Sequence, residues 1–440
     1  MIRFAKSLFV VVTLVPSLAS GQVVTDSTPV VTLTEARRRS QSVDPNAVAA
    51  RSRMETASWE HRAAVANLLT PNLRATTAYT HFSDPFFNFG TGAISPNSTS
   101  ATLEATYTLL GAGKFGDLKS SRASVESADA SETVARYRSA LETDAAYFAV
   151  LSDQELSRVA AERLKRAEEQ MGIARVRVIA GEAIASDSLQ LLLEMNRAKV
   201  AILSSDSALM SSRLRLGRRI GIDGPANAEP LDTVKPPPLP MTQEQAIAEM
   251  RRRGPDVEAA RALEKNRSAI LLARRERYLP EINIGATMGA YDSELFPSAL
   301  KRNQWSVGVS IPIWNGGARE LDVARARADQ TVARATRVDI ERAAGEVIGQ
   351  AYHGYLTASA GIDLALVGVA AATENYRVQG ARYREGATTI LDLLEAQVAL
   401  SEAQASLIQS RYATRLALAQ IEALLGRRIF ETPNTNTNVR

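Results

Sequence analysis

The sequence Leu216-Gly-Arg-Arg-Ile220 recurs letter for letter as Leu425-Gly-Arg-Arg-Ile429, 209 residues further along the chain. Shorter matches lie before this motif in each half, in the same order and at nearly the same spacing. They pair Pro71-Asn-Leu with Pro280-Glu-Ile, Ala146-Tyr147 with Ala351-Tyr352, and Gly181…Asp187 with Gly386…Asp392. Chance can supply one short match, but it does not supply a collinear series with small insertions and deletions. The chain is therefore two copies of one unit, and that unit must build the fold twice.

The domain organisation follows from the repeat. We expect a signal peptide at 1–21, the first repeat at 22–223, a proline-rich linker at 224–240, the second repeat at 241–430 and a polar tail at 431–440. The stretch at 224–240 is expected to be a linker that joins the two repeats, because it is rich in proline and includes Pro236-Pro237-Pro238.

The first 21 residues have the three regions of a secretory signal. Arg3 and Lys6 precede the apolar run Leu8–Val15, and small residues before Gln22 favour cleavage there. A membrane anchor would need about 20 apolar residues, and this run is too short. No other apolar stretch of about 18 residues is evident, so we expect an exported protein that crosses no membrane as a helix.

Composition excludes several classes of protein. With 45% hydrophobic and 23% charged residues among 440, the chain is neither wholly disordered nor a bundle of membrane helices. Without cysteine it has no disulfides or thiolate chemistry, and its three widely separated histidines do not suggest a metal centre. A formal charge of +4 is too balanced for nucleic-acid binding. No cluster of acid, base and nucleophile is apparent, so we expect no enzyme activity and no cofactor.

Each repeat is expected to contain one β-hairpin, at 71–110 and at 280–313. Alternating side chains predict strands over 71–82, 101–110, 281–291 and 304–313, with a turn-rich loop at 83–100. Strands of about 10–12 residues are long enough to cross a bilayer at a tilt. A soluble hairpin shows the same alternation, and the recurrence in both halves of an exported protein is what favours the membrane.

Long helices fill the rest of each repeat. We expect them at 34–68, 114–180 and 187–220, and again at 243–277, 317–385 and 391–426. The longest two far exceed the three turns of an average helix, and their apolar residues recur every seven positions, which is typical of a coiled coil. The two shorter helices of each repeat together match the length of its longest one, so we expect them to stack end to end along it. A compact soluble bundle has the same period and stays open as an alternative.

Several short motifs, in this order, resemble the TolC-type outer-membrane efflux proteins, the outer membrane factors of tripartite efflux and secretion systems. The motifs are Leu33-Thr-Glu-Ala36, Pro312-Ile-Trp-Asn-Gly-Gly317 and Tyr383-x-x-Gly386-x-x-x-x-x-Asp392-Leu-Leu-Glu395-Ala-Gln. The resemblance covers about residues 34–430 and implies an α+β membrane protein. In it, a homotrimer closes a twelve-stranded transmembrane β-barrel that is continuous with a long periplasmic α-helical coiled-coil barrel. The need for more than one chain also follows without the resemblance. Four strands leave two free edges whose N–H and C=O groups lipid cannot satisfy, so other chains must close the sheet.

The resemblance also implies a function and partners. The protein would be a passive exit duct of a tripartite efflux or type I secretion system, located in the outer membrane and extending into the periplasm. It would couple through a periplasmic adaptor protein to an inner-membrane pump of the RND or ABC type, contact outer-membrane lipid and bind no nucleic acid. The alternative is a periplasmic coiled-coil adaptor or scaffold protein, which would need one hairpin and intervening β-domains.

By the same resemblance, the functional residues lie at the turns between paired helices. Asp392 and Glu395 match the paired acids that face the aperture, and three chains would supply a ring of six carboxylates that favours cations. Asp187 and Tyr383 match an acid and its tyrosine partner in the network that closes the aperture. Crowding of like charges in such a ring should raise the pKa of its carboxylates. For any single helix acid, a solvated helix face is the simpler explanation.

Gly181 and Gly386 match the tips that contact the adaptor, although a helix that reverses direction favours glycine there in any case. Two positions depart from the family pattern. Glu395 stands where aspartate is common, and Thr388 stands where a basic residue is often found.

Overall fold

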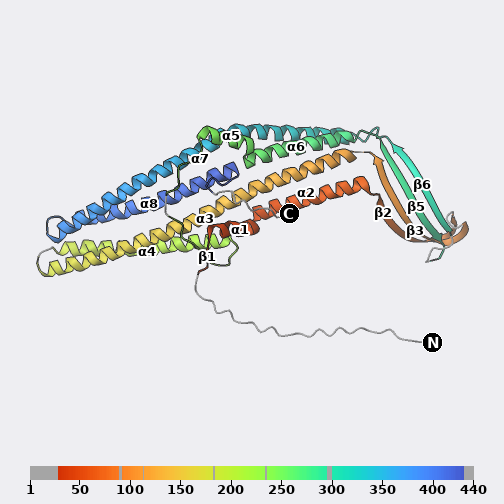
Figure 1. The fold of residues 1–440 in the computed structure, drawn as a ribbon. Coiled ribbons are helices and arrows are strands. Elements are labelled where there is room, and N and C mark those ends of the chain that lie inside the picture. Colours follow the sequence, from red (N-terminus) through yellow and green to blue (C-terminus); the bar gives the residue numbers. More distant parts are fainter. Residues whose placement is uncertain are drawn as a thin grey trace, which may run out of the picture.

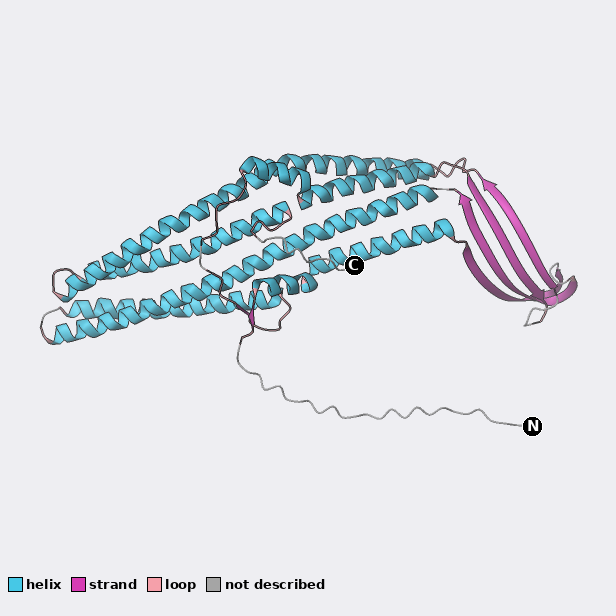
Figure 2. Ribbon diagram, viewed as in Figure 1, coloured by secondary structure: helices cyan, strands magenta, loops and turns pink. Residues whose placement is uncertain are grey.

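The computed structural model describes residues 28–88, 92–111, 113–181, 184–232, 235–294 and 300–430, so the expected signal peptide and polar tail lie outside the described residues. The chain forms a long rod of helices with one curved sheet at an end (Figures 1 and 2). The first repeat contributes β1 (Val30–Val31), α1 (Leu33–Val43), α2 (Pro45–Leu69), β2 (Asn72–Asn88), β3 (Ala93–Leu110), α3 (Lys114–Ile179) and α4 (Ala185–Arg219). The linker and second repeat contribute β4 (Asn227–Ala228), α5 (Gln243–Arg253), α6 (Pro255–Glu276), β5 (Glu281–Asp292), β6 (Leu300–Ser310), α7 (Ala318–Arg384) and α8 (Ile390–Leu425).

The first helix expected in each repeat is in fact two helices. The breaks fall at Asp44-Pro45, between α1 and α2, and at Gly254-Pro255, between α5 and α6. Proline has no N–H to continue a helix but fits its first position, so each proline starts a new helix. Asp44 also caps α2, because its side chain accepts a hydrogen bond of 2.8 Å from the backbone N–H of Asn46. The prediction of one continuous helix at these places was therefore wrong.

The helices are arranged as their lengths predicted. α4 and the pair α1–α2 lie along successive parts of α3, while α8 and the pair α5–α6 lie along successive parts of α7 (Figure 1). α3 also contacts α6 and α8, which joins the two repeats. In the half of the rod that is far from the sheet, the order is α4, α3, α8, α7, so α4 and α7 are the outer helices.

The recurring Leu-Gly-Arg-Arg-Ile motif lies where the half-length helices meet. Arg219 in the first copy forms an ion pair of 2.9 Å with Asp44, at the junction of α1 and α2. Arg428 in the second copy lies 3.7 Å from Asp144, in the middle of α3. Asp144 is only 1% exposed and also accepts two hydrogen bonds, of 2.6 and 2.7 Å, from Arg37 of α1. The repeated arginines thus fix the ends of α4 and α8 to the centre of the molecule.

Two buried tyrosines hold the linker against the long helices. The hydroxyl of Tyr147 in α3 donates to the backbone oxygen of Glu229, and that of Tyr355 in α7 donates to the backbone oxygen of Pro237, both at 2.8 Å. These two linker carbonyls therefore have buried partners, one from each repeat, and the linker is attached to both repeats.

The four long strands form one antiparallel sheet in the order β2-β3-β5-β6. β2 and β3 have 17 and 18 residues, so the loop expected at 83–100 is mostly strand and that prediction was wrong. The pairing is irregular between His81 and Phe86, and Pro85 and Pro96 both fall at this irregularity. A proline is tolerated there because the ladder needs no N–H at that point. β6 begins earlier than expected and ends at Ser310, before Pro312.

α7 contains an apolar stretch that contradicts one expectation from the sequence. A window of 18 residues in this helix has a mean hydropathy of 1.6, which is apolar enough by length and composition for a membrane span. The expectation that no such stretch exists beyond the signal peptide was therefore wrong. Only 6% of this window is buried within the chain. The apolar residues of α7 are thus largely exposed on an outer helix.

Candidate functional site

Two helix turns lie together at the end of the rod that is far from the sheet (Figure 1). One joins α3 to α4 and the other joins α7 to α8, and we call them the first and second tips. Gly181 and Gly386 follow the last residues of α3 and α7 with φ of 78° and 74°. These angles lie in the left-handed region, where a side chain would be strained. Both glycines therefore supply the left-handed residue that commonly ends a helix.

Asp392 starts α8 and is held by its own turn. Its Oδ2 atom accepts hydrogen bonds from the hydroxyls of Thr389 and Thr388, at 2.6 and 2.7 Å, and from the backbone N–H of Thr389 at 3.0 Å. The Thr389 side chain accepts in return from the N–H of Asp392 at 3.3 Å, which completes a capping box. The Thr389 and Thr388 hydroxyls hold the pKa of the Asp392 carboxyl below its ordinary value of 3.8. Within one chain, the pKa therefore shifts in the direction opposite to the expected rise.

Glu395 lies one turn further along α8, and its side chain is exposed. It forms no hydrogen bond or ion pair with any residue in the described ranges. At positions i and i+3, Asp392 and Glu395 share one helix face. This face is directed to solvent in the single chain, so both carboxylates are free to meet other groups in an assembly.

Tyr383, by contrast, is buried in the core that joins the two tips. It is 2% exposed and packs with Ala174 of α3, Leu191 of α4, and Ile390 and Leu393 of α8. Burial raises the pKa of its phenol, the negative charge of Asp187 adds to the rise, and the positive charge of a nearby arginine opposes it. The hydroxyl has no hydrogen-bond partner among the described residues.

That arginine is Arg177, in the last turn of α3, which the sequence analysis did not single out. Its Nη1 atom donates to the backbone oxygen of Tyr383 at 2.5 Å, and its guanidinium carbon lies 5.0 Å from the centre of the Tyr383 ring. It also lies close to Gly386, because a Cβ atom there would be 3.4 Å from its Nη2. A useful signal in the sequence was its repeat partner: Arg177 and Arg382 are 205 residues apart, the same spacing as Gly181 and Gly386.

Asp187 lies in the first turn of α4 and is half-buried. Its backbone N–H donates to the carbonyl of Ile184 at 3.0 Å. The structure therefore brings Asp187, Tyr383 and Arg177 together between the tips. It leaves Asp392 and Glu395 apart from them, on the exposed start of α8.

The sheet has two chemically different faces. Residues directly opposite in an antiparallel register share a face, so the strand pairing assigns each side chain to one of the two. The apolar face carries Leu73, Ala75, Leu103, Tyr107, Ile282, Ile284, Met288, Trp305, Val307 and Val309. The polar face carries Arg74, Thr76, Thr102, Glu104, Thr106, Asn283, Thr287, Arg302, Gln304 and Ser306.

A cluster of metal-binding side chains is not found among the described residues. The chemical features of the structure are therefore the acids at the tips, the buried contact between the tips and the two-faced sheet.

Comparison with known proteins gives agreement at the levels of sequence and fold. Residues 246–427 match the family model of the outer membrane efflux protein. The chain is 26% identical over 296 residues to two proteins of Pseudomonas putida, the probable efflux pump outer membrane protein TtgC and the antibiotic efflux pump outer membrane protein ArpC. Each match covers 64% of this chain and 59% of the relative, so the chain spans about three-fifths of the length of these relatives.

Two solved structures have the same fold over most of their length. The Campylobacter jejuni CmeC outer membrane channel superposes with a TM-score of 0.76 at 16% identity, covering 91% of this chain and 87% of that one. The open state of the Neisseria gonorrhoeae MtrE outer membrane channel gives 0.73 at 21% identity, covering 91% of both chains. The repeat, the two-faced sheet and these matches together make the chain similar to the TolC-type outer-membrane efflux proteins, and they support a location in the outer membrane with an extension into the periplasm.

Proposed function

We propose that this protein is the outer-membrane exit duct of a tripartite efflux or type I secretion system. It is a passive channel, and an inner-membrane pump of the RND or ABC type drives export through a periplasmic adaptor. The names of the Pseudomonas putida relatives, which are efflux pump outer membrane proteins, support this function. The observation that carries the proposal is the two-faced sheet with unpaired edges, attached to helices whose outer faces are apolar.

The apolar face of the sheet has the height of a membrane. On β6, Trp305, Val307 and Val309 lie on this face, and exposed apolar residues continue at every second position through Ile311 to Ile313, which is 89% exposed. At a rise of about 3.3 Å per residue and a tilt of about 40°, the eight steps from Trp305 to Ile313 span roughly 20 Å of membrane thickness. This is most of the apolar band of an outer-membrane barrel, which is roughly 25 Å tall. The polar face would then line the pore.

The edges of the sheet require other chains. β2 and β6 each pair on one side only within the described residues. Unpaired N–H and C=O groups cost several kcal/mol each in lipid, so the edge of β6 must meet the edge of β2 in another copy. Three copies would close a twelve-stranded barrel, and the number three rests on the family resemblance.

The helices carry a matching pair of unpartnered stripes. The α4 stripe consists of exposed residues at steps of three, four or seven, which keep to one helix face, namely Leu189, Leu193, Val200, Leu203, Met210 and Leu214. The α7 stripe consists of exposed residues at steps of eight, three and eleven, which also keep to one helix face, namely Leu356, Leu364, Val367 and Val378. Because α4 and α7 are the outer helices, the α4 stripe of one copy would pack on the α7 stripe of the next. Such a head-to-tail contact closes a ring, and it explains why α7 is apolar enough to resemble a membrane span.

At the tips, the ring would place Asp392 and Glu395 of each copy around the aperture, where carboxylates favour cations. Asp187, Tyr383 and Arg177 would hold the first and second tips together and so narrow the opening. Because Thr388 is not basic, Arg177 supplies the cation of this contact from the first tip. Gly181 and Gly386 would be exposed to the adaptor at the turns.

Cross-linking in native membranes tests the assembly. We expect extraction to require detergent and cross-linked species to stop at three copies. Leu203→Glu should abolish the higher species, because it places a charge in the α4 stripe. Ala208→Glu, on the same helix but exposed away from the stripe, is the matched control and should leave them unchanged. A protein that is released from membranes without detergent, or that remains mainly a monomer or dimer in mild detergent, would instead indicate a periplasmic adaptor or scaffold.

A further inference from the structure

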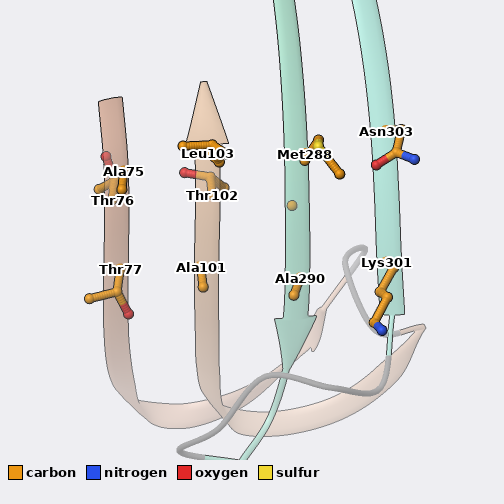
Figure 3. A pocket seen from close by; sticks show the side chains of 11 residues that line it. Ala75, Thr76, Thr77, Ala101, Thr102, Leu103, Met288, Ala290, Lys301 and Asn303 are labelled. Carbon is orange, nitrogen blue, oxygen red and sulfur yellow. The ribbon is translucent and has the colours of Figure 1, made fainter. Parts of the chain in front are cut away.

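The apolar face of the sheet contains a hollow of about 570 Å³ (Figure 3). One row of paired residues crosses it, formed by Thr77, Ala101, Ala290 and Lys301 from the four strands. Leu103 and Met288, in the next row, form its apolar wall. Lys301 is the second residue of β6, so the hollow lies toward the loops, away from the helices.

The second feature of the hollow is the charge of Lys301. Its side chain is exposed and makes no hydrogen bond or ion pair with any residue in the described part of the chain. Asp292, on the same face but one row nearer the loops, accepts hydrogen bonds from the backbone N–H groups of Ser293 and Glu294, at 2.7 and 3.3 Å. In a closed barrel, β6 would meet β2, whose apolar face carries no carboxylate from Leu73 to His81. Among the described residues, therefore, neither the same chain nor the edge of a second copy offers Lys301 a carboxylate partner on this face.

The depth of Lys301 in a membrane follows from the column of side chains on β6. The column is apolar from Ile313 to Trp305 and becomes polar at Asn303 and Lys301. Lys301 therefore lies where hydrocarbon gives way to headgroups on the loop side of the membrane. A lysine at this depth can extend its ammonium group toward the headgroups while its methylenes cover apolar surface.

We propose that this hollow binds one acyl chain of a membrane lipid whose phosphate headgroup pairs with Lys301. The apolar wall and small floor residues accept the chain, and the unpaired ammonium group accepts the phosphate. A free phosphate ion would use only the second of these features. The inference rests on the proposed membrane-spanning sheet and adds a specific lipid site to it.

Native mass spectrometry of the full-length protein in detergent, titrated with phosphatidylglycerol, tests this site. Lys301→Gln should bind the lipid about five-fold more weakly and lose one bound lipid per chain at intermediate concentrations. Arg302→Gln is the matched control, because it removes the same charge one residue further along β6, on the polar face. It should bind as the unmodified protein does. Ala290→Leu, which fills the hollow and keeps Lys301, should also weaken binding.

Three results would overturn the proposal: unchanged binding in Lys301→Gln, an equal loss in Arg302→Gln, or displacement of the lipid by millimolar inorganic phosphate. Unchanged binding in Ala290→Leu would overturn the placement of the acyl chain. Reconstitution into vesicles separates this proposal from the proposed function. If the unmodified protein does not insert, the membrane-spanning sheet is wrong, whereas insertion with unchanged binding in Lys301→Gln contradicts the lipid site alone.

Discussion

Arg177 at the end of α3 donates a hydrogen bond of 2.5 Å to the backbone oxygen of Tyr383 at the end of α7. The two residues are 206 positions apart, and each belongs to a different repeat. Together with the stacking of the guanidinium on the Tyr383 ring, this contact ties the first tip to the second.

Arg177→Ala should loosen the tips. The variant loses a charge-assisted hydrogen bond, which contributes about 1.5–3 kcal/mol, and a cation–π contact. We expect the backbone amides of Gly386 and Ala387 to exchange hydrogen at least ten-fold faster, measured by mass spectrometry. Arg175→Ala, an exposed arginine on the same turn, is the control and should leave exchange unchanged. Equal exchange in Arg177→Ala and the unmodified protein would show that the contact does not hold the tips.

Thr389→Val should weaken the start of α8. It removes the hydroxyl that gives and receives hydrogen bonds with Asp392, and the loss of such a cap costs about 1 kcal/mol. The pKa of Asp392 should move up toward 3.8, because the hydrogen bonds that lower it are lost. NMR titration of the carboxyl would measure this, with Thr373→Val on exposed α7 as the control. In the unmodified protein the stabilising effect of this carboxylate is present above pH 3.8 and is lost as the pH falls through the lowered folded-state value.

Asp144→Asn should destabilise the whole protein. Arg37 and Arg428 lose a buried counter-charge, and breaking a buried ion pair costs about 3–5 kcal/mol. Glu142→Gln is the matched control on the same helix, because Glu142 pairs with Arg219 at 2.9 Å but is 47% exposed. It should cost less than about 1 kcal/mol. Thermal unfolding in detergent would compare the two, and similar losses would contradict the central role of Asp144.

Tyr147→Phe should change the response to alkaline pH. Burial raises the pKa of Tyr147 from 10.0 to about 12, so the folded state disfavours the phenolate. Its contribution to stability is present below pH 10, and about 2–3 kcal/mol is lost as the pH rises toward 12. The variant should be about 1 kcal/mol less stable at pH 7, because it loses the hydrogen bond to Glu229. It should be less sensitive between pH 10 and 12 in denaturant titrations, and an unchanged slope there would refute the assignment.

The sequence predicted the arrangement of the helices because that arrangement depends on length and periodicity. The spacing of the Leu-Gly-Arg-Arg-Ile motifs revealed the repeat, and the helix lengths predicted the stacking along α3 and α7. The breaks before Pro45 and Pro255 were missed because a proline near the start of a helix is compatible with one helix or two. The extent of β2 and β3 was missed because Ser, Thr and Asn residues favour turns unless a neighbouring strand pairs with them.

At the tips, the sequence indicated contacts within one helix turn but not contacts between residues far apart in the chain. The pattern Thr389-x-x-Asp392 is that of a capping box, and it explains one of the two acids without any pore. The contact between Arg177 and Tyr383 depends on how the two repeats pack, so neither periodicity nor local propensity could indicate it. The exposed stripes on α4 and α7 also required the structure, because their residues differ from buried ones only in what lies opposite them.

We propose that the assembled protein is a channel whose periplasmic mouth carries the Asp392 and Glu395 carboxylates. The most direct test of this proposal is single-channel recording in a planar bilayer under a salt gradient, with Asp392→Ala/Glu395→Ala as the variant. We expect discrete conductance steps, a reversal potential that shows cation preference near neutral pH, and loss of that preference in the variant without loss of assembly. Protein that inserts and assembles but conducts no ions would contradict the channel, and an unchanged reversal potential in the variant would contradict the placement of these two acids.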